Sequence, residues 1–432
     1  MMRRLAVASL VFAAACGNDA SAPAPPAFNP YALSANAWAG GELLVRTAVR
    51  VPDGTRIVVG SDTLALTIVD DSTVSATMPG DANGVLDVRL VGSWGYVPVG
   101  SVHVFGFHDV VTGPKVSGYS QPAGGGLLPI VLVNGDTSLI RLDLRTASVT
   151  AYPSAIHDLR CARGPGPTPT ENVVVVGNSY NSGCKFAVWQ LLPTPQLLLD
   201  SVHGSSRITA RFNSTQWLLG GSHDICLARS VPTFSQTCTQ YESMQGVRFS
   251  PRGDRAFVYY ANNATGNRIP IFSAATGDTA FTVGSAQWNA GAGFTPDGDT
   301  LLLASGGLPW GNLLRSLNAN TGQVYASIDL GNALSTEDVA MDPSSPYAYV
   351  LGWTSEPSGL YAHLLVLDRR TLTMIGHVKV IAKSQPTAGF LCSSCENRLF
   401  LDQAGRQLYV LGVPGWDPQA TPAVIGRFDL LP

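Results

Sequence analysis

The residues best suited to chemistry are polar side chains that lie three to five positions before a recurring turn. Carboxylate and carboxamide oxygens are the ligands that calcium prefers, and a mixed polar set can equally bind a polar ligand. The alternative is a solvated ring whose charges pair with one another. The candidate residues are His157, Arg207, Gln245, Asn289, Glu337, Asp338, Glu396 and Arg398.

A second candidate set is aromatic and lies in segments rich in Gly, Pro and Asn, which is the composition of loops. The segments are "GNSYNSG", "GGLPWGN", "GWTSEPSGLY" and "VPGWDPQATP". An aromatic ring on a loop can stack on a sugar or anchor a protein partner. It can also cover a neighbouring structural unit and bury its own ring. The residues are Tyr180, Trp310, Trp353 and Trp416.

The chain carries no recognisable catalytic signature. It has no G-x-S-x-G elbow, its seven histidines form no HxH or HExxH pair, and no phosphate-binding glycine pattern occurs. The stretch "PDGDT" at 296–300 resembles part of a calcium loop but lacks the downstream acids, so we interpret it as a turn. No catalytic residue is assigned, and Ca²⁺ is the one cofactor that the polar set suggests.

The turn that positions both sets repeats along the chain. "VRFSPRGDRAFVYY" at 247–260 returns as "AGFTPDGDTLLLAS" at 292–305. Third and fourth copies follow, and three weaker copies precede them, which makes seven units about 47 residues apart. The residues at the start of the turn are Tyr119, Arg160, Phe212, Phe249, Phe294, Met341 and Leu401.

A second motif places a small polar residue three positions before a threonine. It occurs at Asp143, Ser273, Asn318 and Asp368, and such turns cap strand ends through side-chain-to-backbone hydrogen bonds. Each unit therefore contains four strands in about 45 residues, which predicts the blade of a β-propeller. The paired "SPDG" and "LDxxTG" turns resemble the repeats of YVTN-type and lactonase-like propellers. The resemblance covers roughly 113–432 and implies a seven-bladed fold.

Propeller geometry gives the two candidate sets a common face. The first strand of each blade begins at the mouth of the central channel, and the loops between second and third strands open on the same side. The last unit, "IGRFDLLP", lacks a fourth strand and would leave an open edge. We therefore expect a segment within about 98–113 to pair with the final blade.

We place the propeller at 107–432. The region before it has a different sequence pattern. Residues 30–106 alternate apolar and polar positions between Gly, Asp and Pro turns, as half-buried strands do. This region resembles an IPT/TIG domain, an immunoglobulin-like β-sandwich, and another small sandwich is the alternative. The whole chain is thus expected to be all-β, with the sandwich as a spacer.

The N-terminal residues resemble a bacterial lipoprotein signal. Residues 1–15 carry Arg3 and Arg4 before an apolar run that is too short to span a bilayer. "AAAC" ending at Cys16 is similar to a lipobox, which implies lipidation of Cys16 and a flexible tether at 16–29. An ordinary signal cleaved after Ala15 is the alternative. By lipoprotein sorting rules, Gly17 favours the outer membrane or cell surface.

Six cysteines remain besides Cys16, and an even number in an exported protein favours disulfides. Local pairing is our prediction. A hairpin centred on Pro232 would place one pair opposite each other. The predicted pairs are Cys161–Cys184, Cys226–Cys238 and Cys392–Cys395.

The amino-acid composition disfavours two kinds of partner, nucleic acid and a second membrane anchor. The net charge is −3 and no basic run occurs, so nucleic acid is a poor candidate. No later stretch is long and apolar enough for a second membrane anchor. Two hypotheses stay open: a non-catalytic envelope lipoprotein that binds an extracellular protein or glycan through its loops, and a metal-dependent lactonase-like hydrolase with a cation at the channel mouth.

Overall fold

The computed structural model contains strands and turns but no helix among the residues that it describes. No membrane-spanning helix occurs within those residues. For parts of the middle blades only the backbone is described. The described ranges are 27–112, 118–120, 130–134, 139–151, 173–176, 185–190, 194, 196–203, 208–211, 216–220, 224–229, 235–240, 244–250, 254–260, 268–273, 279–284, 289–295, 297–306, 312–330, 334–342, 344–356, 359–383, 397–412 and 424–432.

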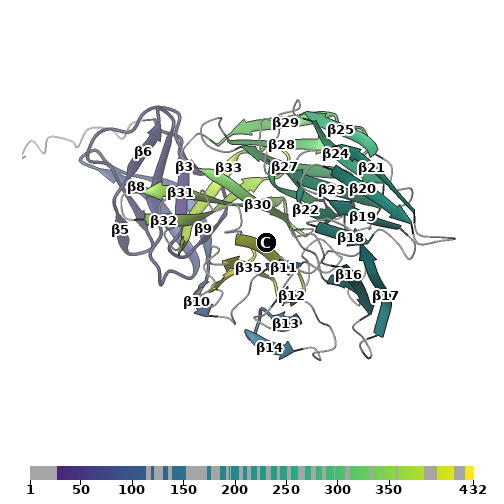
Figure 1. Ribbon diagram of the computed structural model, residues 1–432. Coiled ribbons are helices and arrows are strands. Elements are labelled where there is room, and N and C mark those ends of the chain that lie inside the picture. The colour runs from purple at the N-terminus through teal and green to yellow at the C-terminus, as the bar shows by residue number, and fades with distance from the viewer. Residues whose placement is uncertain are drawn as a thin grey trace, which may run out of the picture.

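The first nine strands form two sheets around one core (Figure 1). β1, β3, β7 and β6 lie in one sheet, and β2, β9, β8, β4 and β5 form the other. Alternating apolar positions from both sheets, such as Val45 and Val74 facing Ile57 and Leu90, share a single buried cluster. The strands are β1 (Tyr31–Ala32), β2 (Asn36–Trp38), β3 (Glu42–Arg46), β4 (Arg56–Val59), β5 (Asp62–Leu64), β6 (Thr67–Asp70), β7 (Thr73–Thr77), β8 (Gly84–Gly92) and β9 (Gly95–Phe105).

The remaining described strands form seven groups of antiparallel neighbours, numbered here as blades 1 to 7, of which blade 6 continues into a sheet of the sandwich. Blades 1 to 4 are β11 (Gly118–Ser120), β12 (Ile130–Asn134), β13 (Leu139–Asp143) and β14 (Ser148–Ala151); β15 (Val173–Val176), β16 (Lys185–Gln190) and β17 (Gln196–His203); β18 (Ile208–Arg211), β19 (Gln216–Gly220), β20 (Asp224–Arg229) and β21 (Ser235–Gln240); and β22 (Met244–Phe249), β23 (Arg255–Tyr260), β24 (Arg268–Ser273) and β25 (Thr279–Gly284).

Blades 5 to 7 are described in the most detail. They are β26 (Asn289–Phe294), β27 (Thr300–Gly306), β28 (Asn312–Asn318) and β29 (Val324–Asp329); β30 (Ser335–Met341), β31 (Tyr347–Glu356), β32 (Gly359–Asp368) and β33 (Met374–Lys383); and β34 (Asn397–Asp402), β35 (Gln407–Gly412), β36 (Val424–Asp429) and the earlier strand β10 (Phe107–Thr112).

The ring closes as expected from the sequence. β10 pairs with β36, with Phe107 opposite Phe428 and Thr112 opposite Val424. Blade 7 also packs on blade 1, because Ile140 and Leu142 share a buried cluster with Phe400 and neighbouring residues of blade 7. The first and last blades are thus joined through a strand exchange and an apolar contact.

The predicted threonine turns are confirmed where they are described. The side-chain oxygen of Asn318 accepts hydrogen bonds from two backbone N–H groups, and that of Asp368 does the same. The residue after the threonine has a left-handed backbone, with φ of 74° at Gly322 and 56° at Leu372. Glycine adopts this conformation without strain, which explains the Thr-Gly pair in the repeat.

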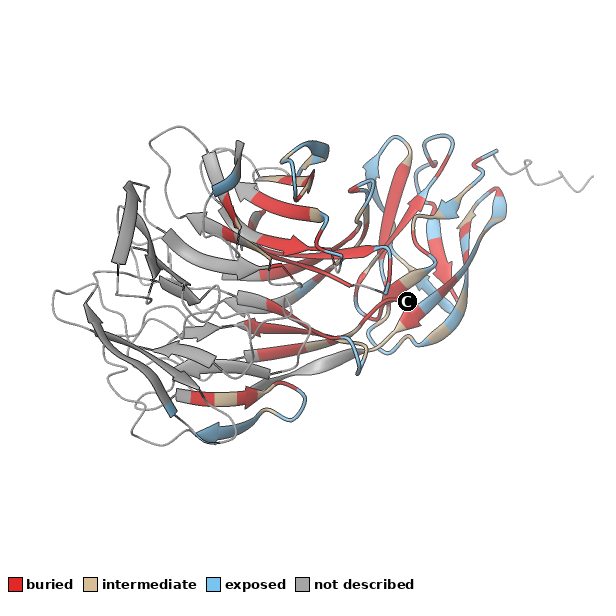
Figure 2. Ribbon diagram, turned by 90° about the vertical axis from the view of Figure 1, so that its right-hand side faces the viewer, coloured by how far each residue is buried: buried red, intermediate tan, exposed pale blue. Residues whose placement is uncertain are grey.

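The sandwich and the propeller share one sheet. β3 pairs with β33, the outermost strand of blade 6, with Glu42 opposite His377 and Leu43 opposite Gly376. Eight strands, from β30 in the propeller to β6 in the sandwich, therefore form one continuous sheet. Figure 2 shows buried residues on both sides of this junction. The junction is named the seam below.

Candidate functional site

The channel-mouth candidates that are described lie at or near the start of the first strand of their blades, and their place at a channel mouth stays a prediction. Gln245 is in β22, Asn289 begins β26, and Arg398 follows the first residue of β34. Glu337 and Asp338 are in β30. Of the predicted set, His157, Arg207 and Glu396 lie outside the described residues.

Blades 4, 5 and 6 share a β-bulge at the same position of their innermost strands. The register shifts between Met244 and Gly246, between Asn289 and Gly291, and between Thr336 and Asp338. The extra residues, Gln245, Ala290 and Glu337, lie four positions before the repeated turn. A bulge leaves one residue out of the ladder and changes the direction of neighbouring side chains, as often occurs beside binding sites.

Asp338 has a structural role that the sequence did not indicate. Its side chain is fully buried, and its carboxylate accepts hydrogen bonds of 2.9 Å from the backbone N–H groups of Val339 and Leu399. Leu399 belongs to β34, so Asp338 joins the innermost strands of blades 6 and 7. Within the described ranges, no three His, Cys, Asp or Glu side chains are placed to hold a metal ion.

The predicted aromatic face is described at one position. Trp353 is not in a loop, as the Gly and Pro content had suggested, but inside β31. The ladder between β31 and β32 continues past it to Glu356 opposite Gly359. Its backbone lies opposite Ser335, the first residue of β30, so it stays near the channel-mouth end of blade 6. Tyr180, Trp310 and Trp416 lie outside the described residues.

One predicted cysteine pair has the expected backbone register. Cys226 in β20 lies directly opposite Cys238 in β21, as a hairpin centred on Pro232 requires. The disulfide itself stays a prediction. The sites at Cys16, Cys161, Cys184, Cys392 and Cys395 lie outside the described residues.

Buried carboxylates join neighbouring blades through arginines. Asp402 of blade 7 receives two hydrogen bonds from the guanidinium of Arg145 in blade 1, one of them 2.6 Å long. Burial raises the pKa of Asp402, but Arg145 and the backbone N–H of Gly405 outweigh it and hold this pKa below its usual value. Burial, followed by the nearby Asp402 charge, raises the pKa of Tyr409 to about 12.

The Asp402 link predicts a specific loss of stability. Asp402→Asn is expected to lower the free energy of unfolding at pH 7 by about 2 kcal/mol, typical of a hydrogen bond to a charged group. Because the folded-state pKa is lowered, this stabilisation is present above pH 4 and is lost as the pH falls further. Urea unfolding from pH 7 to pH 3 should show the difference from wild type shrinking. Asp143→Asn is the matched control, and a difference independent of pH would contradict the assignment.

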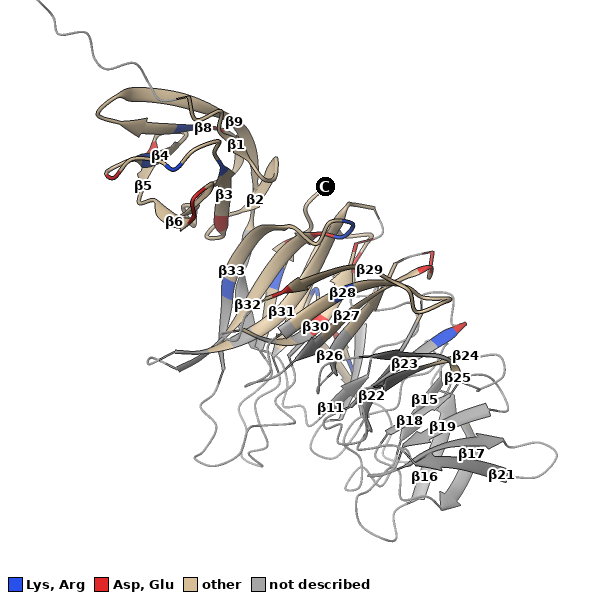
Figure 3. Ribbon diagram, turned by 90° about the horizontal axis from the view of Figure 1, so that it is seen from above, with Lys and Arg blue, Asp and Glu red and all other residues tan. Residues whose placement is uncertain are grey.

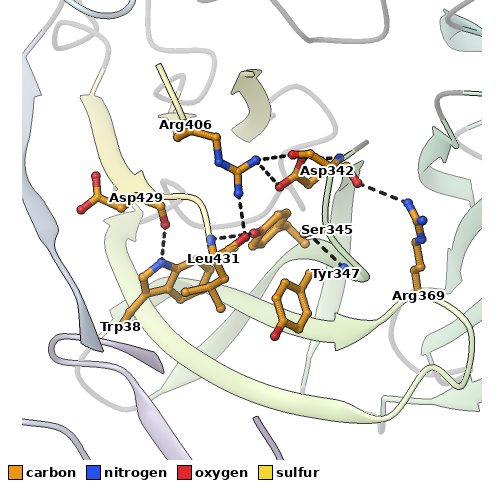
Figure 4. A network of polar contacts seen from close by, with 10 residues as sticks. Trp38, Asp342, Ser345, Tyr347, Arg369, Arg406, Asp429 and Leu431 are labelled. Carbon is orange, nitrogen blue, oxygen red and sulfur yellow. Dashed lines mark hydrogen bonds and ion pairs between the residues drawn. The ribbon is translucent and has the colours of Figure 1, made fainter. Parts of the chain in front are cut away.

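A second network holds Asp429 and Leu431 against blade 6 and the sandwich (Figure 4). Arg406 donates to the Asp342 carboxylate at 2.8 Å and to the Leu431 carbonyl at 2.8 Å. The Asp342 side chain is fully buried. Beside it, the Trp38 indole N–H donates to the Asp429 carbonyl at 2.7 Å. Trp38 comes from the sandwich, so one network contains the sandwich, blade 6 and the closing blade.

Trp38 is a shared core residue of the two parts of the molecule. It is 3% exposed and belongs to the apolar cluster of blades 6 and 7. Its ring centroid lies 5.2 Å from that of Phe428 and 5.7 Å from that of Tyr349. Asn36 adds a hydrogen bond of 3.2 Å to the Tyr347 hydroxyl. The sandwich is thus docked by packing as well as by strand pairing.

The seam also holds a chain of four polar side chains that the sequence did not predict. Glu42 Oε2 lies 3.2 Å from His377 Nδ1, and His377 Nε2 lies 2.6 Å from His363 Nδ1. His363 Nε2 lies 2.7 Å from Thr354 Oγ1. The side chains come from β3, β33, β32 and β31, four successive strands of the continuous sheet. His363 is 7% exposed.

Comparison with solved structures supports the propeller. The chain is similar to the β-propeller domain of Cps50 (Swd1) from Myceliophteria thermophila, with 11% identity and a TM-score of 0.50 over 74% of this chain and 98% of that one. A chain in a Mitotic Checkpoint Complex matches with 13% identity and a TM-score of 0.52, over 75% and 92%. No protein-family model and no curated sequence matches the chain. The fold and these likenesses define an all-β protein of the β-propeller class.

Proposed function

We propose that this protein is a binding protein whose propeller captures an extracellular protein or glycan on its channel-mouth face. The observation that carries the proposal is the bulge repeated at the same position in blades 4, 5 and 6. Each bulge leaves peptide groups outside the ladder at the start of an innermost strand, where they can contact a bound partner. Trp353, the one predicted aromatic residue that is described, lies in β31 with its backbone opposite Ser335 at the start of β30.

The contacts of the buried carboxylates favour a binding function over a hydrolytic one. Asp338 holds two backbone N–H groups, and Asp342 and Asp402 pair with arginines of other blades. These buried carboxylates link neighbouring blades, and a surface held in place by such links would lose less conformational entropy when it binds. Figure 3 shows that charged residues are sparse along the described blade strands, in keeping with recognition through aromatic and peptide groups.

The proposal includes the cellular setting expected from the sequence. In it, the chain is exported and anchored to the envelope through lipid on Cys16, with residues 16–29 as a tether. The sandwich holds the propeller away from the membrane. Its continuous sheet with blade 6 supports this spacer role, because it fixes the propeller relative to the sandwich.

The test is loss of binding in a triple variant. Trp310, Trp353 and Trp416 are replaced by alanine, and the purified chain is compared with wild type on a glycan array and against isolated envelope proteins. We expect at least about 30-fold weaker binding, the effect of losing one hot-spot residue worth 2 kcal/mol. Tyr96→Ala is the matched control, because Tyr96 is an aromatic residue that is 63% exposed on the sandwich. Unchanged binding by the triple variant would rule out this face.

A further inference from the structure

The chain of polar side chains at the seam ends on a hydroxyl group, and its protons have one consistent arrangement when both histidines are neutral. The pKa of Glu42 is lowered, chiefly by the hydrogen bond from His377, and an ionised carboxylate can only accept. His377 Nδ1 therefore carries a proton, and His377 Nε2 accepts from His363 Nδ1. His363 Nε2 is then an acceptor, and the Thr354 hydroxyl donates to it at 2.7 Å.

This order of donors and acceptors is the one that activates a hydroxyl nucleophile. Such sites place the hydroxyl within about 2.6–3.2 Å of a basic nitrogen, and a third group orients the base. In this chain His363 Nε2 is the base, and His377 fixes its other nitrogen while Glu42 holds His377 in turn. Geometry rather than sequence position defines such a set, so no short motif marks it along the chain.

Strand register explains how the hydroxyl and its base meet. Thr354 lies opposite Tyr361 in the ladder of β31 and β32, so His363 is its diagonal neighbour. Gly352 lies directly opposite His363 and has no side chain, which leaves room for the imidazole to reach toward Thr354. His363 is buried and Thr354 is partly exposed, so the base is shielded from water while part of Thr354 stays accessible.

We propose that Thr354 is a covalent acylation site: with His363 as its general base, its hydroxyl accepts an acyl group from an activated ester. Thr354 and His363 touch the reacting atoms, and His377 and Glu42 are positioning residues. The proposal does not depend on the proposed function, because it rests on the contacts of Thr354 and not on a bound protein or glycan.

The step balances within this set of groups. Thr354 Oγ1 forms a bond to the carbonyl carbon of the ester as its proton passes to His363 Nε2. The bond from that carbon to the leaving oxygen then breaks, and the leaving oxygen takes the proton from His363 Nε2. While His363 is charged, the Glu42 carboxylate stabilises it through His377. Nothing is oxidised or reduced, and the chain returns to its neutral arrangement.

The chemistry favours acyl esters that carry a good leaving group. The chain supplies a nucleophile, a base and positioning groups, and general base catalysis is typically worth about 100-fold to 10,000-fold in rate. A phenolate leaves readily without help from further protein groups. p-Nitrophenyl acetate has such a leaving group and is therefore the probe.

One additional proton on the chain removes the base. If His377 is charged, its Nε2–H donates to His363 Nδ1, and His363 Nε2–H then donates to the Thr354 oxygen. The hydroxyl no longer has an acceptor for its proton at that nitrogen. Acylation of Thr354 should therefore slow on acidification.

The groups around the chain set the charge that this proton meets. Glu42 of β3 favours the proton, and Lys379 of β33, which lies opposite His363 in the strand register, disfavours it. Among the described residues of β7 and β31, Ser75 and Thr354 contact the chain with neutral hydroxyls.

Acetylation of the full chain by p-nitrophenyl acetate tests the proposal, with peptide mass spectrometry to measure the ester on each threonine. Thr77 is the internal reference, because it is an exposed threonine of β7 in the same continuous sheet. We expect Thr354 to be acetylated at least about 100-fold faster than Thr77 at pH 8. The ratio of the two rates should fall between about pH 8 and about pH 5, the range in which histidines titrate.

The variant His363→Gln removes the base and keeps a side chain that can hydrogen-bond Thr354. It should lower acetylation of Thr354 to the rate of Thr77. Equal rates at the two threonines in the wild-type protein overturn the proposal without reference to any variant. Undiminished acetylation in His363→Gln, or a wild-type ratio that does not change with pH, overturns it as well, because Thr354 would then react without the help of His363.

Discussion

Trp38→Ala is expected to lower the free energy of unfolding by about 3–5 kcal/mol, the range for truncating a large buried aromatic residue. Trp38 packs on Tyr349 and Phe428 and donates its indole N–H to the Asp429 carbonyl. Its removal leaves a cavity between the sandwich and the two last blades. The loss should also separate one cooperative unfolding transition into two, which scanning calorimetry can resolve.

Two controls distinguish docking from general destabilisation. Trp38→Phe keeps an aromatic ring in the cluster and loses the N–H donor, so it should cost much less than alanine. Trp94→Ala truncates a tryptophan of similar burial, 7% exposed, that packs within the sandwich core. It should lower the midpoint of the single unfolding transition without dividing it in two. If Trp38→Ala behaved like Trp94→Ala, the shared core would not couple the two parts.

Arg406→Met should be as damaging as the loss of Trp38, at about 3–5 kcal/mol, because it leaves a buried carboxylate without its cation. Arg406 is the arginine that pairs with the fully buried Asp342 side chain, and it also donates to the Leu431 carbonyl. Methionine keeps the length and the apolar stem of arginine. Urea unfolding at neutral pH measures the loss.

Arg369→Met is the matched control for this prediction. Arg369 contacts the same residue, but its guanidinium donates to the backbone carbonyl of Asp342 at 3.3 Å rather than to the carboxylate. We expect a loss below about 1 kcal/mol. Equal effects of the two substitutions would show that the buried charge at Asp342 does not depend on Arg406.

The architecture was predictable because each blade needs the same local turn. The Pro/Gly turn and the Thr turn each depend on residues within a few positions of one another. Both turns can therefore be recognised from the sequence alone. The final blade takes one of its four strands from an earlier part of the chain, β10 at Phe107–Thr112, as the sequence predicted. Cys226 and Cys238 lie opposite each other for a similar reason, since hairpin symmetry fixes their register.

The seam was not predictable, because its contacts join residues far apart in sequence. Glu42 and His377 are 335 positions apart, and Trp38 and Asp429 are 391 apart. No periodicity connects such pairs. Neither His363 nor His377 belongs to a short motif. Their proximity depends on β3 adding to the edge of blade 6, which is a tertiary event.

One local prediction was wrong, and one candidate residue has a structural role that the sequence did not indicate. Gly352 and the Pro-Ser-Gly stretch after Trp353 suggested a loop, but strand pairing with β32 extends the ladder through Glu356. Asp338 has the residue type of a cation ligand and lies in the expected strand. Residue type does not reveal burial, and the carboxylate is satisfied by two backbone N–H groups instead.

The continuous sheet also has a mechanical consequence. Pulling on the segment that precedes the sandwich would first load the sandwich strands, and from there the force divides between the β3–β33 ladder and the docked Trp38. β10 follows β9 directly in the chain. The β3–β33 ladder and Trp38 carry the force into the propeller, so β10 bears little of the tension. A propeller held at this end would keep its ring closed under forces that would otherwise peel its closing strand away.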